Sequence, residues 1–262
     1  MRKRREPRGS RKGMWHLPDF YFEDQDRRRS TEYGILLESY PTIKTGQPQK
    51  DSVVIPGRGT LYLDTGTYSD TVITLQIGMT DRNLKSLDIS IPDYAVNENI
   101  SGLYFDVLEY ISAMKEISFC DNPDYFYIVK NVELSATAQD SDVSVDFTVT
   151  LTCEPGAYLV VGKREHEVPE VLQNRYNVAH PVYKITGEGN CTLTINRHIV
   201  TANVAQNLTI DTDRMVAYRE DGTLQNTAVT GDYEDMYLLP GQNAITLTEG
   251  FTLKVIPNWR RL

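Results

Sequence analysis

The residues that could carry out chemistry are few in this chain and lie far apart. The four histidines, His16, His166, His180 and His198, occur singly, and none belongs to a His-x-x-x-His or His-Glu-x-x-His pattern. Those spacings place two imidazoles on one face of a helix around a zinc ion. We therefore expect each histidine to be a structural or surface residue, and we expect neither a metal nor a cofactor.

Asp211 and Asp213 are the one pair of carboxylates whose spacing suggests a site. Two residues apart on a strand, they would share a face and could support acid–base or Ca²⁺ chemistry. However, Ile210-Asp211-Thr212-Asp213 stands where a strand is expected to end, and aspartate at such a place caps turns. Turn capping is therefore the preferred interpretation, with the chemical site as the alternative.

The sequence also lacks the patterns of a nucleophile or a phosphate site. No serine stands in a Gly-x-Ser-x-Gly context, and Cys120, Cys153 and Cys191 form no Cys-x-x-Cys pair. Gly57-Arg58-Gly59 and Gly187-Glu188-Gly189 are not followed by Lys-Ser/Thr, so we interpret them as turns rather than phosphate loops. The sequence therefore predicts free, buried thiols and a protein that is not an enzyme.

Charge is distributed unevenly along the chain. Residues 1–12 hold seven Lys/Arg and one Glu, or +6, while the remainder holds 20 Lys/Arg and 35 Asp/Glu, or −15. An acidic body argues against general nucleic-acid binding, which requires a basic face. No apolar segment follows the basic start, and no run of about 18 apolar residues exists. We therefore expect neither a secretory signal nor a contact with the membrane.

The spacing of apolar residues predicts the elements that would position any site. Residues 100–116 are predicted to form a helix, because apolar residues recur there at helical intervals. Residues 143–153 alternate between apolar and polar, which is typical of a strand with one buried face. Residues 162–180 are polar without a clear period, and we predict that they link two domains.

The C-terminal part reads as short strands separated by turns, which is typical of a β-sandwich. Pro240-Gly241 supplies one turn, because proline presets φ and glycine accepts a positive φ. Phe251, Leu253 and Val255 then alternate with polar residues. We expect this last strand and Trp259 to be buried in the sandwich, so that the end of the chain is part of the fold.

Several short motifs follow one another between residues 55 and 260. They are Ile55-Pro56-Gly57-Arg58-Gly59, Phe147–Pro155, Pro181–Gly187, Ile210-Asp211-Thr212, Pro240-Gly241-Gln242-Asn243 and Pro257-Asn258-Trp259-Arg260. Their types and order resemble those of siphophage distal tail proteins (Dit), although residues 1–30 have no counterpart there. The resemblance implies structural or assembly roles for Pro56, Gly57, Arg58, Gly59, Pro240, Gly241, Asn243, Trp259 and Arg260.

The resemblance also implies a fold and a function. The fold would be mainly β, with an arm of residues 1–30, a ring-forming β-barrel-like domain with one α-helix over residues 31–164, and a galectin-like β-sandwich over residues 165–262. Members of the family form a homo-hexameric ring, the baseplate hub at the tail tip of the virion. The ring links the tail-tube protein to a tail-tip lysin or tail-associated protein and can anchor receptor-binding proteins. DNA passes through its lumen without specific binding.

Two alternatives remain open from the sequence. The second candidate function is a carbohydrate-binding β-sandwich that recognises the host wall through exposed aromatic and polar rows on one sheet. The basic arm could lie on an acidic surface of a neighbouring subunit, or it could contact DNA or the tape-measure protein in the lumen. It could also precede a true start at Met14.

Overall fold

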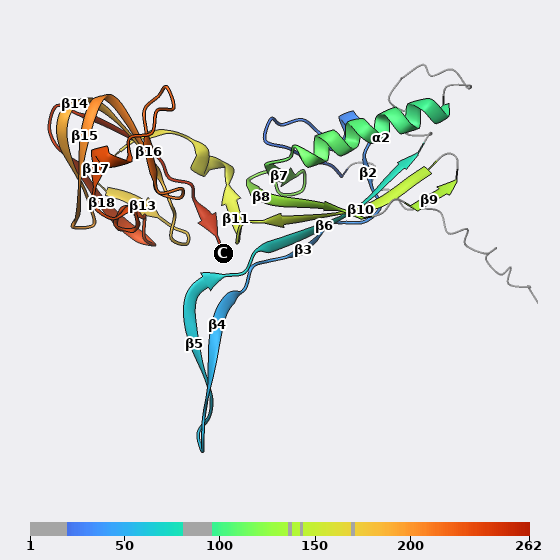
Figure 1. The fold of residues 1–262 in the computed structure, drawn as a ribbon, viewed down its shortest axis with the longest axis horizontal. Coiled ribbons are helices and arrows are strands. Elements are labelled where there is room, and N and C mark those ends of the chain that lie inside the picture. The colour runs from blue at the N-terminus through green and yellow to red at the C-terminus, as the bar shows by residue number, and fades with distance from the viewer. Residues whose placement is uncertain (1–19, 81–95, 136–137, 142–143, 169–170) are drawn as a thin grey trace, which may run out of the picture. The chain divides into compact units, whose positions relative to one another are not determined.

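A computed structural model of the protein describes residues 20–80, 96–135, 138–141, 144–168 and 171–262 (Figure 1). The fold is mainly β, as predicted, and it divides into two compact units that are each discontinuous in sequence. Unit 1 comprises the chain up to Lys44, Asp70–Asp121 and Val129–Cys153. Unit 2 comprises Thr45–Ser69, Asn122–Ile128 and Glu154–Leu262, so the predicted domain boundary at residue 164 lies inside it.

Unit 1 is built around one sheet with the strand order β1-β7-β8-β10-β6-β2. Strand β10 pairs with β6 over ten residues, from Ser144↔Thr80 to Cys153↔Thr71. Within the described residues this path is open, running from β1 at one end to β2 at the other, with β3 added beside β6 and β9 beside β10. The strands are β1 (Phe22–Glu23), β2 (Leu36–Leu37), β3 (Thr42–Lys44), β6 (Thr71–Thr80), β7 (Glu116–Phe119), β8 (Tyr125–Leu134), β9 (Ala138–Ser141) and β10 (Ser144–Cys153).

The predicted strand at residues 143–153 corresponds to β10. Phe147, Val149 and Leu151 on its apolar face are buried and lie opposite Ile77, Leu75 and Ile73 of β6. Thr148 and Thr150, on the other face, are half-buried. The alternation in the sequence therefore reports a sheet with one buried face.

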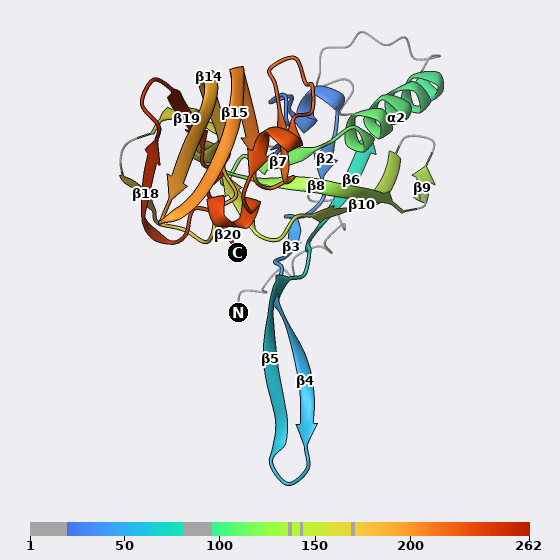
Figure 2. The same ribbon diagram turned by 60° about the vertical axis from the view of Figure 1, so that its left-hand side comes forward.

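The helix α2 (Val96–Ser112) lies along this sheet (Figure 2) and begins and ends four residues before the predicted range of 100–116. Val107, Tyr110 and Ile111 are buried. The predicted end was wrong because Met114 continues the apolar spacing and is buried, although it already lies in the turn that leads to β7. The start differs because apolar spacing predicts the presence of a helix better than it predicts the residue at which the helix begins.

Residues 20–30, which the sequence placed in an N-terminal arm, belong to the core of unit 1. Phe22 in β1 is fully buried, and its ring lies 6.2 Å from that of Tyr110 on α2. Phe20 packs on Phe119 and Tyr40. The short helix η1 (Ser30–Tyr33) follows. The predicted arm at residues 1–13 and Trp15 lie outside the described residues.

The sandwich of unit 2 is organised by one long hairpin. Strands β14 (Val182–Ile195) and β15 (His198–Asp211) pair over their whole length, from Val182↔Asp211 to Ile195↔His198. Buried and exposed residues alternate at both ends of β14 but not across residues 187–190. At Gly187 the ring of Phe251 comes so close that a Cβ would lie 2.3 Å from it, so a larger residue would require this ring to move.

The two halves of β14 have different partners, and this creates two layers. Its first half pairs with β19 from Val182↔Ile256 to Thr186↔Thr252, and its second half pairs with β18 from Leu193↔Leu247 to Ile195↔Ile245. Apart from the hairpin within Thr45–Ser69, the remaining elements of unit 2 extend these strands or connect them, and β11 also pairs with β8. They are β11 (Ala157–Leu159), η3 (Val160–Lys163), β12 (His166–Glu167), β13 (Val171–Asn174), β16 (Val216–Tyr218), η4 (Asn226–Ala228), β17 (Val229–Thr230), η5 (Tyr233–Met236), β18 (Gly241–Leu247), β19 (Thr252–Ile256) and β20 (Arg260–Arg261).

The prediction that residues 162–180 form a linker was wrong. Strand β12 pairs with β19 and β13 pairs with β18, so this segment supplies edge strands to the sandwich. Edge strands of two to four residues have little buried face and therefore carry no alternation that a sequence could show. Within the described residues, no helix is long and apolar enough to span a membrane.

Candidate functional site

The motif Pro56-Gly57-Arg58-Gly59 forms the tip of a hairpin made by β4 (Pro48–Ile55) and β5 (Gly59–Tyr68), drawn in Figure 2 as a ladder of two strands. The amide of Arg58 donates to the carbonyl of Ile55 at 3.0 Å, and Gly57 has a φ of 80°. A positive φ at the third residue defines a type II turn, in which proline is favoured second and glycine third. The four motif residues therefore set the turn that defines the hairpin.

The hairpin has one markedly apolar face. Opposed residues share a face, and Val53↔Leu61 and Asp51↔Leu63 are opposed, so Val53, Ile55, Leu61 and Leu63 point the same way. The other face is mixed, because Ser52 lies opposite Tyr62 and Val54 lies opposite Thr60. A protein normally buries such an apolar face.

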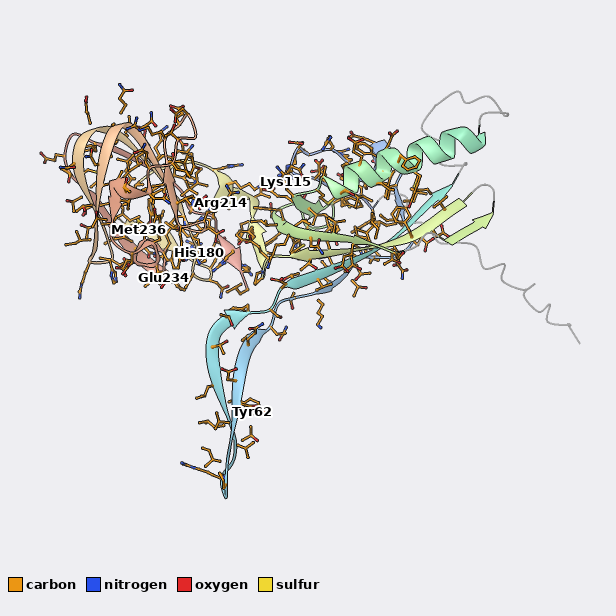
Figure 3. The ribbon with its side chains drawn as sticks, viewed as in Figure 1. Tyr62, Lys115, His180, Arg214, Glu234 and Met236 are labelled. Atoms are coloured by element: carbon orange, nitrogen blue, oxygen red, sulfur yellow. The ribbon has the colours of Figure 1, made fainter. Side chains whose placement is uncertain are left out.

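This apolar face is open to solvent. Val53, Leu61 and Leu63 keep 48%, 48% and 49% of their surface exposed. On the opposite face Tyr62, labelled in Figure 3, keeps 66%. Between Pro48 and Thr67 every residue is exposed except Ile55, which is half-buried. An isolated two-stranded hairpin is at best marginally stable in water. The described residues leave about half of the surface of these aliphatic side chains in contact with water.

The base of the hairpin is held by polar contacts. The amide of Ser69 donates to the carbonyl of Gln47 at 2.9 Å, and the amide of Gln47 donates to the Ser69 hydroxyl at 3.0 Å. Thr65 donates to the carbonyl of Gln49 at 2.8 Å beside a register shift between Pro48 and Lys50. These bonds fix the two strands to each other without covering either face.

Pro240, Gly241 and Asn243 lie together at the start of β18. Asn243 is fully buried, and its Oδ1 accepts from the amide of Leu239 at 2.9 Å while its Nδ2 donates to the carbonyl of Leu239 at 2.8 Å. The same Oδ1 also accepts from Asn196 at 2.7 Å, which ties the turn to the end of β14. These contacts give Asn243 a role inside the sandwich, and an assembly role for these residues stays a prediction.

Trp259 is buried in the core of the sandwich, as predicted, and its ring lies 6.2 Å from that of Tyr176. Val255 is fully buried, and Phe251 and Leu253 pack against the same core. The carbonyl of Trp259 accepts from the amide of Leu159 at 2.8 Å, next to the pairing of β20 with β11.

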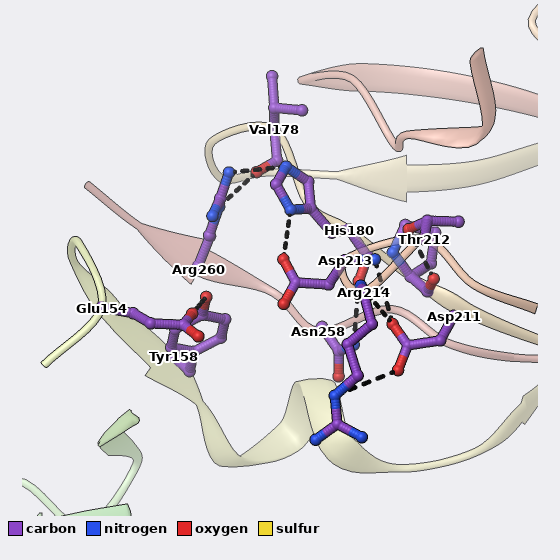
Figure 4. Close-up of polar contacts among 11 residues, drawn as sticks. Glu154, Tyr158, Val178, His180, Asp211, Thr212, Asp213, Arg214, Asn258 and Arg260 are labelled. Atoms are coloured by element: carbon purple, nitrogen blue, oxygen red, sulfur yellow. Dashed lines mark hydrogen bonds and ion pairs between the residues drawn. The ribbon is translucent and has the colours of Figure 1, made fainter. Parts of the chain in front are cut away.

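Arg260 belongs to a polar cluster that the sequence did not indicate (Figure 4). Its Nε donates to the carbonyl of Val178 at 2.8 Å, and a terminal nitrogen lies 2.9 Å from Nε2 of His180. Nδ1 of His180 lies 2.6 Å from Asp213, and its ring stacks on Tyr237 at 4.1 Å. The members are too far apart in sequence for any spacing to have revealed them.

The cluster contains a His–Asp pair, but its geometry does not suit catalysis. An arginine is always protonated and only donates, so Nε2 of His180 must be the acceptor and its proton must be on Nδ1, facing Asp213. The hydrogen bond from His180 holds the pKa of Asp213 below its usual value. Since Arg260 occupies the nitrogen that would act as the base, the pair fixes the end of the chain in place.

The Asp211 carboxylate caps a turn, which was the preferred interpretation. Its Oδ1 accepts from the amides of Asp213 and Arg214, each at 3.1 Å. Among the described residues, no three His, Cys, Asp or Glu side chains are grouped as a metal would require. Cys153 and Cys191 are buried free thiols, and Cys120 is half-buried.

Three aromatic residues of the sandwich are engaged in its packing. Tyr183 and Trp259 are buried, and the Tyr183 hydroxyl donates to the carbonyl of Met236 at 2.9 Å. Phe251 is half-buried against the core. These three rings serve the packing of the sandwich, whereas the hairpin exposes its aliphatic side chains, and we take the hairpin as the candidate functional surface.

Comparison with known proteins points to one fold. No protein-family model matches the sequence, and no curated protein matches it. Among solved structures, the crystal structure of SPP1 Dit (gp 19.1) matches with a TM-score of 0.61 and 12% identity, over 90% of this chain and 97% of that chain. That protein is described as a paradigm of the hub adsorption apparatus in phages that infect Gram-positive bacteria. The chain therefore has a Dit-like fold over nearly its whole length.

Proposed function

We propose that this protein is a structural subunit of a siphophage tail tip, a distal tail protein that serves as the baseplate hub of the virion. The observation that carries the proposal is the likeness of fold to a phage hub protein across nearly the whole of both chains. The order of the short sequence motifs between residues 55 and 260, which resembles that of distal tail proteins, also supports it.

In this function six copies form a ring through which DNA passes without specific binding. The ring joins the tail-tube protein to a tail-tip lysin or tail-associated protein and offers an anchor to receptor-binding proteins. An acidic body suits a passage for DNA, since like charge prevents the DNA from adhering.

The apolar face of the β4–β5 hairpin supports self-assembly as the origin of the ring. Val53, Leu61 and Leu63 are exposed in the single chain, and burial of such residues is the main favourable contribution to most protein association. A second copy of the chain is the proposed occupant, because every subunit of a closed ring has a neighbouring copy of the same chain beside it.

The test compares two faces of the same hairpin. The variant Val53→Asp/Leu61→Asp should stay monomeric at concentrations at which the wild-type chain forms rings by mass photometry and negative-stain imaging. The control Ser52→Asp/Thr60→Asp adds the same charge to the opposite face and should still form rings. Rings that form equally well in the first variant would contradict the role of this face, and a wild-type chain that never forms rings would contradict the hub.

A further inference from the structure

A surface cavity of about 460 Å³ lies between η1 and α2 in unit 1. Its wall is preformed, because the rings of Tyr33 and Tyr110 stack with their centroids 4.1 Å apart. The Tyr110 hydroxyl donates to the carbonyl of Arg28 at 3.0 Å, which ties α2 to the segment before η1. The shape of the cavity is therefore fixed by contacts that do not depend on a ligand.

The cavity carries negative charge that the described chain does not neutralise. Glu32, Asp106 and Glu109 line it, together with one cation, Arg28. Arg28 is already engaged by Asp24, with contacts of 2.7 and 2.8 Å, and this pairing raises its pKa. No ion pair among the described residues engages Asp106 or Glu109, and both are exposed.

An apolar residue stands beside this charge on the uncovered face of α2. Phe105 is 67% exposed, and it precedes Glu109 by four residues, so the two side chains are neighbours on the helix surface. A ligand that matches this surface would carry positive charge and at least one large apolar side chain.

We propose that this cavity and the adjacent face of α2 bind the N-terminal segment of the same chain, residues 1–17. That segment has the required chemistry, with seven Lys/Arg in its first 12 residues followed by Trp15 and Leu17. Its tether is also in the right place. The described chain begins at Phe20, and the ring of Phe22 lies 6.2 Å from that of Tyr110 in the cavity wall.

The geometry favours the segment of the same chain over other basic ligands. Nineteen extended residues span up to about 60 Å, so the segment reaches the cavity without strain. A short tether keeps it there at an effective concentration in the millimolar range. The basic residues then neutralise Glu32, Asp106 and Glu109, and an apolar side chain covers Phe105. The inference concerns the single chain and does not depend on ring formation.

The test measures how well the segment is protected from an arginine-specific protease in the full chain. In Asp106→Lys/Glu109→Lys the segment should be cleaved about tenfold faster than in the wild type at low salt, and the difference should shrink at high salt. Both side chains are exposed and lysine is a good helix former, so this variant should fold. Glu188→Lys/Glu249→Lys makes the same change in charge at two exposed positions of unit 2, and this matched control should be cleaved like the wild type.

A second variant keeps α2 intact and changes the ligand. Replacement of Arg2, Lys3, Arg4 and Arg5 by glutamine should shift the emission of Trp15 to longer wavelength, while the contribution of buried Trp259 stays constant. Equal cleavage of the wild type and the lysine variant, with unchanged Trp15 emission, would overturn the proposal. Protection that rises with protein concentration would also overturn it, because the occupant would then be another copy.

Discussion

The hairpins β14–β15 and β4–β5 have the same secondary structure and opposite surroundings. In the first, Leu193 and Val200 lie opposite each other and are 0% and 1% exposed. In the second, Val53 and Leu61 lie opposite each other and each is 48% exposed. Both pairs are aliphatic, so the difference lies in what packs against them.

The comparison shows that a strand pattern determines which residues share a face but not what covers that face. The cover of β14–β15 comes from other segments of the same chain, because Leu193 and Val200 lie in one buried core with residues such as Leu159, Met236 and Trp259. For β4–β5 no described segment plays that part. The predictions below test whether the two hairpins differ as this contrast requires.

The largest effect is expected at Trp259, which helps to close the core over β14–β15. Trp259→Ala should lower the free energy of unfolding by about 3–5 kcal/mol, as other large-to-small changes in cores do. Urea unfolding of the purified protein measures it, and Trp259→Phe serves as the milder control. If Trp259→Ala unfolds at the wild-type urea concentration, the end of the chain does not contribute to the core.

The same substitution in each hairpin tests the contrast directly. Leu193→Ala should cost about 2–5 kcal/mol, because it leaves a cavity in a closed core. Leu61→Ala should change the stability of the monomer by no more than about 0.5 kcal/mol, because that side chain is already half in water. Equal losses at dilute concentration, measured by thermal unfolding, would mean that the β4–β5 face is covered within the single chain.

A smaller difference is expected for side chains that bind backbone amides in the two regions. Asn243→Ala should cost about 1–3 kcal/mol, because it leaves the buried amide of Leu239 without a partner. Asp64 accepts from the amide of Gly66 at 2.9 Å in the exposed hairpin, where water can replace it. Asp64→Ala should therefore lie within about 0.5 kcal/mol of the wild type in the same denaturation experiment.

The smallest effect concerns pH and the edge of the sandwich. Hydrogen bonds from Lys184 and Lys254, each 2.7 Å long, lower the pKa of Glu165 from 4.5 to about 2. A lowered pKa in the folded state stabilises the protein above the ordinary pKa, and that stability is lost as pH falls towards the lowered one. The difference in melting temperature between wild type and Glu165→Gln should therefore shrink between about pH 5 and about pH 2.5. A difference that does not vary with pH would show that these ion pairs contribute no stability.

The sequence predicts the parts of this fold in which one face is buried. The alternation at residues 143–153 identifies β10, and the helical spacing identifies α2 with an error of four residues at each end. It misses β5, because Leu61-Tyr62-Leu63 is an unbroken apolar run with no period of two. Neither face of β5 is buried by the described residues. Its sequence therefore does not need to alternate between apolar and polar residues, and no such pattern marks the strand.

Of the candidate surface on the β4–β5 hairpin, the sequence predicted only the turn at its tip. Pro56-Gly57 fixes a turn through φ, which is a local property that a sequence reports well. The apolar face depends on the register Val53↔Leu61, and the cluster of His180, Asp213 and Arg260 depends on contacts between distant segments. Such long-range placement follows from the packing of the whole unit.

The late partners of β12 and β13 have a consequence for how the chain is made. His166 pairs with Val255 and Val171 pairs with Ala244, so these strands leave the ribosome well before the segments that complete them. At about 5–20 residues per second the delay amounts to roughly 5–20 seconds. During that interval an apolar strand would be prone to aggregate with other nascent chains, whereas His166 and Glu167 are polar and exposed. The polar composition of β12 thus lowers the tendency of this strand to aggregate before β19 has been made.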